Sequence, residues 1–271
     1  MLLLIKRIIA FIILLAVLFI GCFFFTDGGA ILNRFIPEAY RTTAEIRALP
    51  FSPDHLPEAD SDTWSRVYRV LALKDAVASR TDHIGYTKID DISRELQYAV
   101  ISSEDKRFYD HHGFDIEGMM RATLVNLQYG KIQEGASTIT QQTVKTLFLN
   151  SERTMSRKAE ELFLALDMEL RYEKSEILEI YLNSIYFGDG YYGINQASHG
   201  YFGCPPSRLT LAQSAMLAGI IPAPSAYSPH VDLDAAKTRQ ALALAAMVRN
   251  GYITEAEAER AKEAPLHLTE K

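Results

Sequence analysis

The chain has 271 residues, 48% of them hydrophobic, and a formal net charge of −6. Once an anchor and a linker are set aside, this length suffices for one domain of roughly 150 to 200 residues with a sizeable core. The mildly acidic balance argues against a general nucleic-acid binder, which normally carries a basic face. Cys22 and Cys204, the two cysteines, lie in very different contexts and do not indicate a disulfide.

The N-terminus predicts a membrane anchor. Lys6 and Arg7 precede an uncharged run of 18 residues, 8–25, which as a helix would be roughly 27 Å long, close to a bilayer core of about 30 Å. The basic pair predicts a cytoplasmic N-terminus and a domain on the outer side. A signal peptide cleaved near Gly28 is disfavoured by the length of the run. A lipoprotein cleavage at Cys22 is disfavoured by the phenylalanines that follow it.

We expect three parts in the chain. Residues 1–30 form a cytoplasmic stub and the anchor. Residues 31–84 form a linker or irregular segment, rich in proline, in which 64–73 fits either a short strand or a helix. Residues 85–271 form a mostly α domain, since apolar residues repeat there at helical spacing and few stretches favour a strand.

Within this domain the spacing predicts helices over 116–129, 157–172 and 175–183. Asp115 is the expected cap of the first helix. Two threonine capping boxes are predicted further on, Thr210 with Gln213 and Thr254 with Glu257. The segment 187–203 is rich in glycine and tyrosine, and we expect it to interrupt the helices as a loop near a site, or as a plain connector.

The stretch 98–115, YAVISSEDKRFYDHHGFD, joins an apolar run to a dense polar cluster. Glu104 and Asp105 end the apolar run, and cations, aromatic residues and two histidines follow directly. A carboxylate at the end of a buried element, ringed by such groups, suits a general base. Taken alone, the same residues also fit a helix that ends in ordinary surface charges.

A second polar cluster, GASTITQQ, covers 135–142, with Lys145 three residues on. The hydroxyl and amide groups of Ser137, Thr138 and Gln141 suit hydrogen bonds to sugar or phosphate oxygens. A helix start capped by Ser137 or Thr138 is the simpler interpretation of this composition.

A third cluster, RTMSRKAEE, covers 153–161 and is rich in cations. Charge-assisted contacts to phosphate are strong, so the cations of this part of the chain would suit a diphosphate. They are Lys145, Arg153, Arg157 and Lys158. The alternative is a solvated helix face on which Arg157 pairs with Glu161.

A fourth cluster, KSEILEIYLN, covers 174–183 and places Glu179 and Asn183 one helical turn apart. A well-formed amphipathic helix would explain this spacing equally well.

The order and spacing of the clusters resemble the peptidoglycan glycosyltransferase family, the lysozyme-like domains of class A penicillin-binding proteins and of monofunctional transglycosylases. The matching motifs are ED-x-x-F-x-x-H-x-G, G-x-ST-x-TQQ, RK-x-x-E and K-x-EILE-x-YLN, followed by AMLAGIIPAPSAYSP at 215–229. Ala136 departs slightly from the glycine that the family often has there. Five motifs in order make a chance match very improbable.

This resemblance implies a lysozyme-like, bilobal helical domain that polymerises lipid II. The 4-hydroxyl of the acceptor sugar would attack the anomeric carbon of the donor, invert it to a β-1,4 link and release undecaprenyl diphosphate. Glu104 matches the general base, a role worth about 10²–10⁴-fold in rate. Glu161 matches the second catalytic carboxylate, and Asp105 matches an acid that positions the substrate.

The resemblance also implies a substrate-binding set around these carboxylates. Its members are Asp105, Ser137, Thr138, Gln141, Lys145, Arg153, Arg157, Lys158, Glu179 and Asn183. A divalent cation, Mg²⁺ or Mn²⁺, assists at the diphosphate in some members of the family, but no metal-ligand spacing is visible in this sequence.

The implied location is the bacterial cytoplasmic (inner) membrane, with one membrane span and the catalytic domain on the periplasmic side. The implied partners are lipid II, the growing glycan on its lipid diphosphate, the membrane, and cell-wall synthesis proteins including transpeptidases; nucleic acid is not among them. The part around 147–155 would be a mobile lobe that touches the membrane.

Two other functions compete with this one. A lysozyme-like glycan hydrolase would use Glu104 and Glu161 as its carboxylate pair, but a neutral glycan does not need the cations. An inactive cell-wall scaffold would need neither the two carboxylates nor the cations. Ser103 and Lys106 fit a transpeptidase Ser-x-x-Lys formally, yet no Lys-Thr-Gly follows. We therefore expect a monofunctional enzyme or the front part of a bifunctional one.

Overall fold

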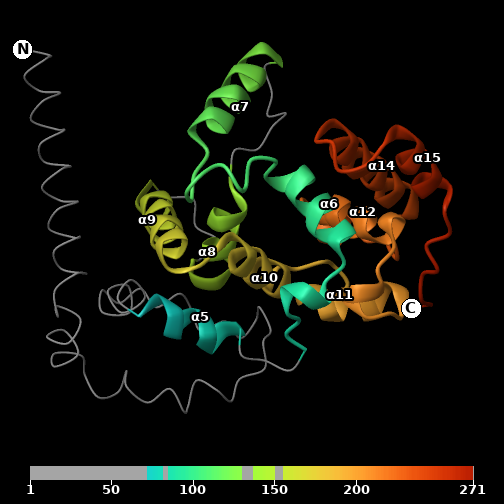
Figure 1. Cartoon of the computed structure of the whole chain (residues 1–271), viewed down its shortest axis with the longest axis horizontal. Helices are drawn as coiled ribbons and strands as arrows, with labels where there is room; N and C mark the ends of the chain where they lie inside the picture. Colours follow the sequence, from blue (N-terminus) through green and yellow to red (C-terminus); the bar gives the residue numbers. More distant parts are fainter. Residues whose placement is uncertain (1–71, 82–84, 130–136, 150–154, 271) are drawn as a thin grey trace, which may run out of the picture. The chain divides into compact units, whose positions relative to one another are not determined.

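Helices make up nearly all regular structure in the computed structural model, which describes residues 72–81, 85–129, 137–149 and 155–270 (Figure 1). In chain order they are α5 (Leu73–Thr81), η3 (Ile89–Asp91), α6 (Arg94–Glu104), α7 (Ile116–Tyr129), α8 (Ile139–Phe148), α9 (Met155–Arg171), α10 (Lys174–Ser184), α11 (Gly193–Phe202), η4 (Pro206–Arg208), α12 (Leu211–Ile220), α13 (Pro224–Tyr227), α14 (Leu233–Arg249) and α15 (Glu255–Glu263). The prediction of a mostly α domain is confirmed.

Local sequence signals set most helix boundaries. The helices predicted over 116–129, 157–172 and 175–183 are α7, α9 and α10, within two residues at each end. The Asp115 carbonyl accepts the first helical bond of α7, from the Met119 amide at 2.9 Å, as a capping residue should. Both predicted threonine capping boxes are present, at the starts of α12 and α15.

The expectation of a continuous loop over 187–203 is wrong. Residues 193–202 form α11, which buries Ile194, Ala197 and Tyr201 at helical spacing. Gly193 and Gly203 bound this helix with positive φ angles of 75° and 63°, a conformation that glycine adopts without strain. The glycines therefore define the ends of a short buried helix, and burial of one face overrides their low helix propensity.

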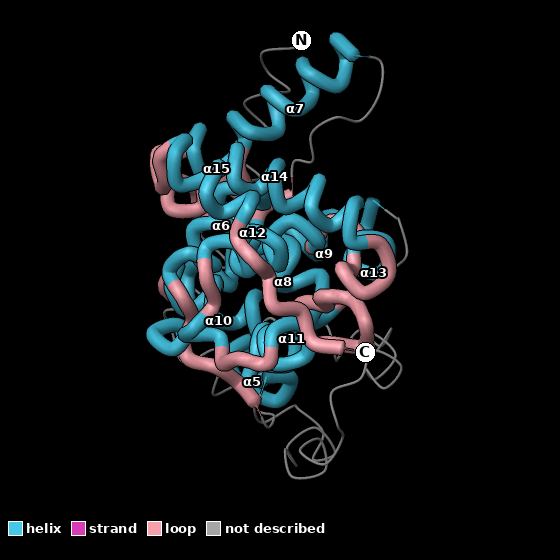
Figure 2. Tube along the Cα trace, turned by 90° about the vertical axis from the view of Figure 1, so that its right-hand side faces the viewer, coloured by secondary structure: helices cyan, strands magenta, loops and turns pink. Residues whose placement is uncertain are grey.

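The described helices pack in two groups. In one, α12 lies against α6 and α14, and α14 also packs against α6 and α15; in the other, α8 packs against α9 and α10, and α5 lies against α9 and α10. Figures 1 and 2 show the two groups from directions 90° apart. Fully buried side chains such as Leu96, Ile139 and Leu217 belong to one core that runs through both groups.

Helix α7 differs from the others because it extends away from both groups in the two views (Figures 1 and 2). Its first turns carry Ile116, Met119 and Met120, which are exposed. The projecting helix thus carries exposed apolar side chains, as does α9 with Phe163, Leu166 and Leu170.

The predicted anchor at 8–25 and most of the predicted linker lie outside the described residues. Among the helices that the structure does describe, none is both long and apolar enough to span a bilayer. Helix α5 begins at Leu73, before the expected domain start at 85, and its Leu73, Ala76 and Val77 are buried in the common core.

Candidate active site

A cavity of about 850 Å³ opens where the end of α6, the starts of α7 and α8, and helix α14 converge. Its lining is strongly polar and comes from both helix groups. The lining residues include Ser102, Ser103, Glu104, Asp105, Lys106, Asp115, Arg121, Ser137, Thr138, Gln142, Arg239, Arg249 and Asn250. The first and second sequence clusters, separated by 19 residues in the chain, thus meet at one cavity.

Glu104 is the last residue of α6 and is partly buried at the cavity wall. Gln142 Nε2 donates a hydrogen bond of 2.9 Å to Glu104 Oε2. Burial raises the pKa of Glu104 above its ordinary value of 4.5; the hydrogen bond from Gln142 and the charge of Arg239 oppose this rise, and Asp105 adds to it. A carboxylate with these neighbours is a stronger base than an exposed one, and it remains connected to the cavity.

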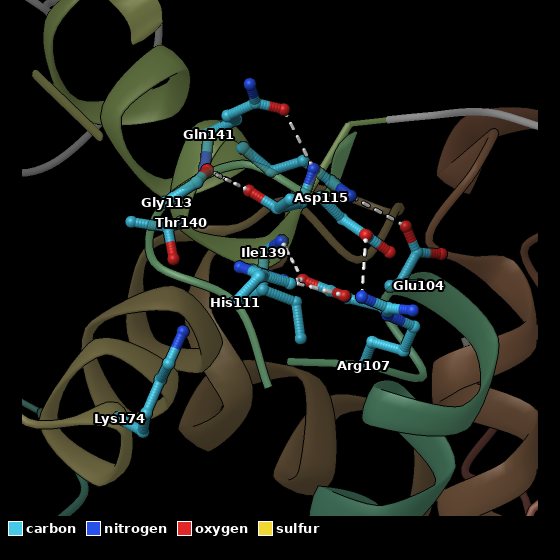
Figure 3. Close-up of polar contacts among 12 residues, drawn as sticks. Glu104, Arg107, His111, Gly113, Asp115, Ile139, Thr140, Gln141 and Lys174 are labelled. Carbon is cyan, nitrogen blue, oxygen red and sulfur yellow. Dashed lines mark hydrogen bonds and ion pairs between the residues drawn. The ribbon is translucent and has the colours of Figure 1, made fainter. Parts of the chain in front are cut away.

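Asp105, the next residue, is buried and fixes the surrounding backbone. Its Oδ2 accepts a 3.0 Å hydrogen bond from the amide of Ile139, the first residue of α8. His111 Nε2 lies 2.9 Å from the same oxygen and 3.1 Å from Oδ1. Figure 3 shows His111 and Ile139 close to each other, to the left of Glu104. Asp105 therefore joins the end of α6, the loop that follows and the start of α8.

The start of α8 is held by a capping box. Thr138 Oγ1 accepts from the Gln141 amide at 3.1 Å, and Gln141 Oε1 accepts from the Thr138 amide at 3.0 Å. The Thr138 hydroxyl also donates to the carbonyl of Gly113 at 2.8 Å. Thr138 and Gln141 thus have structural partners, as the simpler interpretation of the cluster predicted. Ser137 is exposed and lines the cavity.

The cation cluster of α9 pairs within its own helix. Glu161 is buried, with Arg157 Nη1 3.0 Å from its Oε2, and its Oε1 accepts from the ammonium of Lys158. Lys145 is exposed on the last turn of α8. These four side chains are not part of the cavity lining, and Arg153 lies outside the described residues.

Glu179 and Asn183 lie on α10, also outside the cavity lining. Glu179 Oε2 accepts from the Ile89 amide at 2.7 Å, and the Asn183 side chain bonds to both the amide and the carbonyl of Thr87 at 2.8 Å. The role that the structure gives them is to fasten residues 87–89 to α10.

Sequence reasoning missed several residues at this site. Gln142 stands beside the predicted Gln141, yet it is Gln142 that contacts Glu104. His111 belongs to the first motif, but the motif alone indicates no role for it. Arg239, Arg249 and Asn250 line the cavity from α14 and its cap. No motif marks these three, whereas the TQQ run and the histidine were visible signals.

The described part of the chain contains no group of three or more His, Cys, Asp and Glu side chains arranged to hold a metal ion. Of the cavity carboxylates, Asp105 is engaged by His111 and Ile139, and Asp115 Oδ1 lies 3.3 Å from Arg107 Nη2 (Figure 3). The described residues therefore do not form a cation site built from protein carboxylates alone.

Comparison with known proteins places this chain in a family. Residues 73–248 match the family described as Transglycosylase. The chain is 48% identical over 182 residues to penicillin-binding protein 1A of Neisseria flavescens, covering 67% of this chain and 23% of that protein. It is 46% identical over 167 residues to penicillin-binding protein 1A of Escherichia coli K12, covering 62% and 20%. A crystal structure of penicillin-binding protein 1A from Haemophilus influenzae matches 48% of this chain and 16% of that chain, at 27% identity and a TM-score of 0.34.

The chain thus spans about a quarter or less of the length of these relatives. The family match covers well over half of the chain and includes Glu104, Asp105, Gln142 and Glu161. The resemblance predicted from the five motifs is confirmed: this chain belongs to the transglycosylase family, as a peptidoglycan glycosyltransferase domain homologous to that of penicillin-binding protein 1A.

Proposed function

We propose that this domain polymerises lipid II into β-1,4-linked glycan, with Glu104 as the general base. The observation that carries the proposal is the position of Glu104, which is partly buried at the wall of a cavity. Several cationic side chains line the same cavity. Glu104 would take the proton of the acceptor 4-hydroxyl as that oxygen attacks the anomeric carbon. The C–O bond to the diphosphate would break as the new bond forms, inverting the anomeric centre.

The leaving diphosphate needs positive charge, because negative charge builds up on it in the transition state. Lys106, Arg121, Arg239 and Arg249 line the cavity itself. Lys145, Arg153, Arg157 and Lys158 remain the sequence-based candidates for the diphosphate, with Glu161 holding Arg157 and Lys158 in place. Ser137 would contribute its hydroxyl to the same substrate.

The full proposal includes the architecture around the site. The two helix groups would be the lobes of a lysozyme-like domain, with the substrate between them, since the cavity takes its lining from both. Residues 1–30 would anchor the domain in the bacterial inner membrane, on the periplasmic side, where a lipid-linked substrate is available. Transpeptidases and other cell-wall synthesis proteins would be its partners.

A glycan hydrolase on the same fold is less well supported. It would need a second free carboxylate facing Glu104 across the scissile bond, about 5 to 9.5 Å away. Glu161 is buried in ion pairs on α9, and Asp105 is held by His111 and Ile139.

The test is incubation of the detergent-solubilised chain with labelled lipid II, beside Glu104→Gln and a matched control, Glu95→Gln. Glu95 is exposed in the first turn of the same helix. We expect polymer from the parent and from Glu95→Gln, and a loss of about 10²-fold or more in Glu104→Gln. Cleavage of preformed glycan without polymerisation would favour the hydrolase. The absence of both activities would favour a scaffold.

A further inference from the structure

Behind Glu104 lies a second layer of hydrogen bonds that the family assignment does not explain. Gln142 Nε2 donates to Glu104 Oε2 at 2.9 Å, and the hydroxyl of Tyr181 donates to Gln142 Oε1 at 3.1 Å. The three side chains come from α6, α8 and α10. They form one chain of donors that ends on the carboxylate.

The direction of this chain matters, because a glutamine amide can present either its oxygen or its NH₂ group to a neighbour. An NH₂ group facing Glu104 stabilises the ionised carboxylate. A carbonyl oxygen facing Glu104 could bond only to the protonated acid. The orientation of Gln142 therefore selects the charge state of Glu104.

Tyr181 is suited to fix this orientation. Its side chain is completely buried, so water does not compete for its hydroxyl. Burial, together with the nearby charges of Glu104 and Asp105, raises the pKa of Tyr181 well above its ordinary value, and the hydroxyl thus keeps its proton at any working pH. A hydroxyl that donates to Oε1 leaves the NH₂ group turned toward Glu104.

We propose that Tyr181 is a positioning residue for the reaction: its buried hydroxyl holds the Gln142 amide so that the amide donates to Glu104 and keeps this carboxylate ionised. The proposal rests on the proposed function only in taking Glu104 as the base. Burial and Asp105 act against the ionised form of Glu104, and the Tyr181–Gln142 pair offsets part of that penalty.

The variant to make is Tyr181→Phe, which removes the hydroxyl and keeps the ring. Gln142 is then free to rotate, and the pKa of Glu104 should rise, so that the acidic limb of the polymerisation rate–pH profile moves up by about one pH unit. The limiting rate at high pH should change little. Tyr201→Phe is the matched control, since Tyr201 is also fully buried and donates to the Phe187 carbonyl at 2.9 Å, outside the cavity lining. It should leave the acidic limb in place.

A double-mutant cycle tests whether Tyr181 acts through Gln142. Gln142→Met should shift the acidic limb at least as far as Tyr181→Phe, and adding Tyr181→Phe to Gln142→Met should produce no further shift. A further shift in the double variant would mean that Tyr181 acts on Glu104 by another route and would overturn the proposal.

A direct titration separates this proposal from the proposed function. In the full chain with ¹³C-labelled glutamate carboxyl groups, the Glu104 signal is the one that disappears in Glu104→Gln. Its midpoint should lie at higher pH in Tyr181→Phe than in the parent and in Tyr201→Phe. An unchanged midpoint overturns the role of Tyr181, whether or not the chain polymerises lipid II. An inactive parent with a shifted midpoint overturns the function and leaves the hydrogen-bond chain standing.

Discussion

The cavity region and the C-terminal end of the domain use the same two devices, a carboxylate–histidine pair and a threonine capping box. At the cavity, Asp105 pairs with His111 and Thr138 caps α8. At the C-terminal end, His230 Nδ1 lies 2.8 Å from Asp189 Oδ2, and Thr254 caps α15. Both pairs are buried.

The two pairs differ in the additional group that each of them binds. Asp105 uses the oxygen that binds His111 to accept the Ile139 amide as well, so the pair fixes the start of the helix that carries Gln142. At the other end, the histidine makes the second bond: His230 Nε2 lies 3.1 Å from the Thr269 carbonyl and ties down the C-terminal segment. Each pair fixes a segment of the chain, and its functional meaning depends on which segment it holds.

The largest expected effect on stability comes from removing the aspartate of each carboxylate–histidine pair. Asp105→Ala and Asp189→Ala should each lower the free energy of unfolding by about 3 kcal/mol, since each leaves buried polar groups unpartnered. Only Asp105→Ala should also slow polymerisation by the folded protein, by about 10- to 100-fold, because α8 and Gln142 lose their position. Thermal unfolding and lipid II polymerisation at matched folded fractions measure the two effects. Equal activity in the two variants would contradict the distinction between the regions.

A smaller effect should distinguish the two capping boxes. Thr138→Ala removes a buried cap and the bond to the Gly113 carbonyl, and should cost about 1–2 kcal/mol. Thr254→Ala removes an exposed cap on α15 and should cost less. Denaturant unfolding of both variants checks this order. A larger loss of unfolding free energy for Thr254→Ala would show that burial does not determine how much these caps stabilise the protein.

The smallest expected effect is on the unfolding temperature, and it comes from the burial of the Glu104 carboxylate. Burial raises the folded-state pKa of Glu104 above 4.5, so this group favours folding most below its unfolded pKa, and that contribution is lost as pH rises through the folded pKa. Glu104→Gln should therefore raise the unfolding temperature relative to the parent at pH 7, and this gain should shrink as pH falls through the folded-state pKa of Glu104 and be lost below about 4.5.

Glu95→Gln, at an exposed position of the same helix, provides the baseline for this comparison. A gain for Glu104→Gln that is independent of pH would contradict the raised pKa.

The candidate site could be predicted in part. Glu104 and Asp105 were identified because their motif is contiguous, and the structure brings them to a cavity. Gln142, Arg239 and Arg249 were not, because which side chains face Glu104 depends on how α8 and α14 pack around α6 rather than on any local pattern. The motif of Glu179 and Asn183 predicts a role in substrate binding, whereas their bonds to residues 87–89 appear only in the folded chain.

By itself, the sequence determined features that depend on neighbours three or four residues apart: helices α7, α9 and α10, the capping boxes of Thr210 and Thr254, and the Arg157–Glu161 pair. Its ordered motifs also determined the family. Tertiary structure alone decided that residues 193–202 form a helix, because the burial that favours it comes from distant segments. It also decided that Gln142 rather than Gln141 meets Glu104, since this contact joins residues 38 apart in the chain.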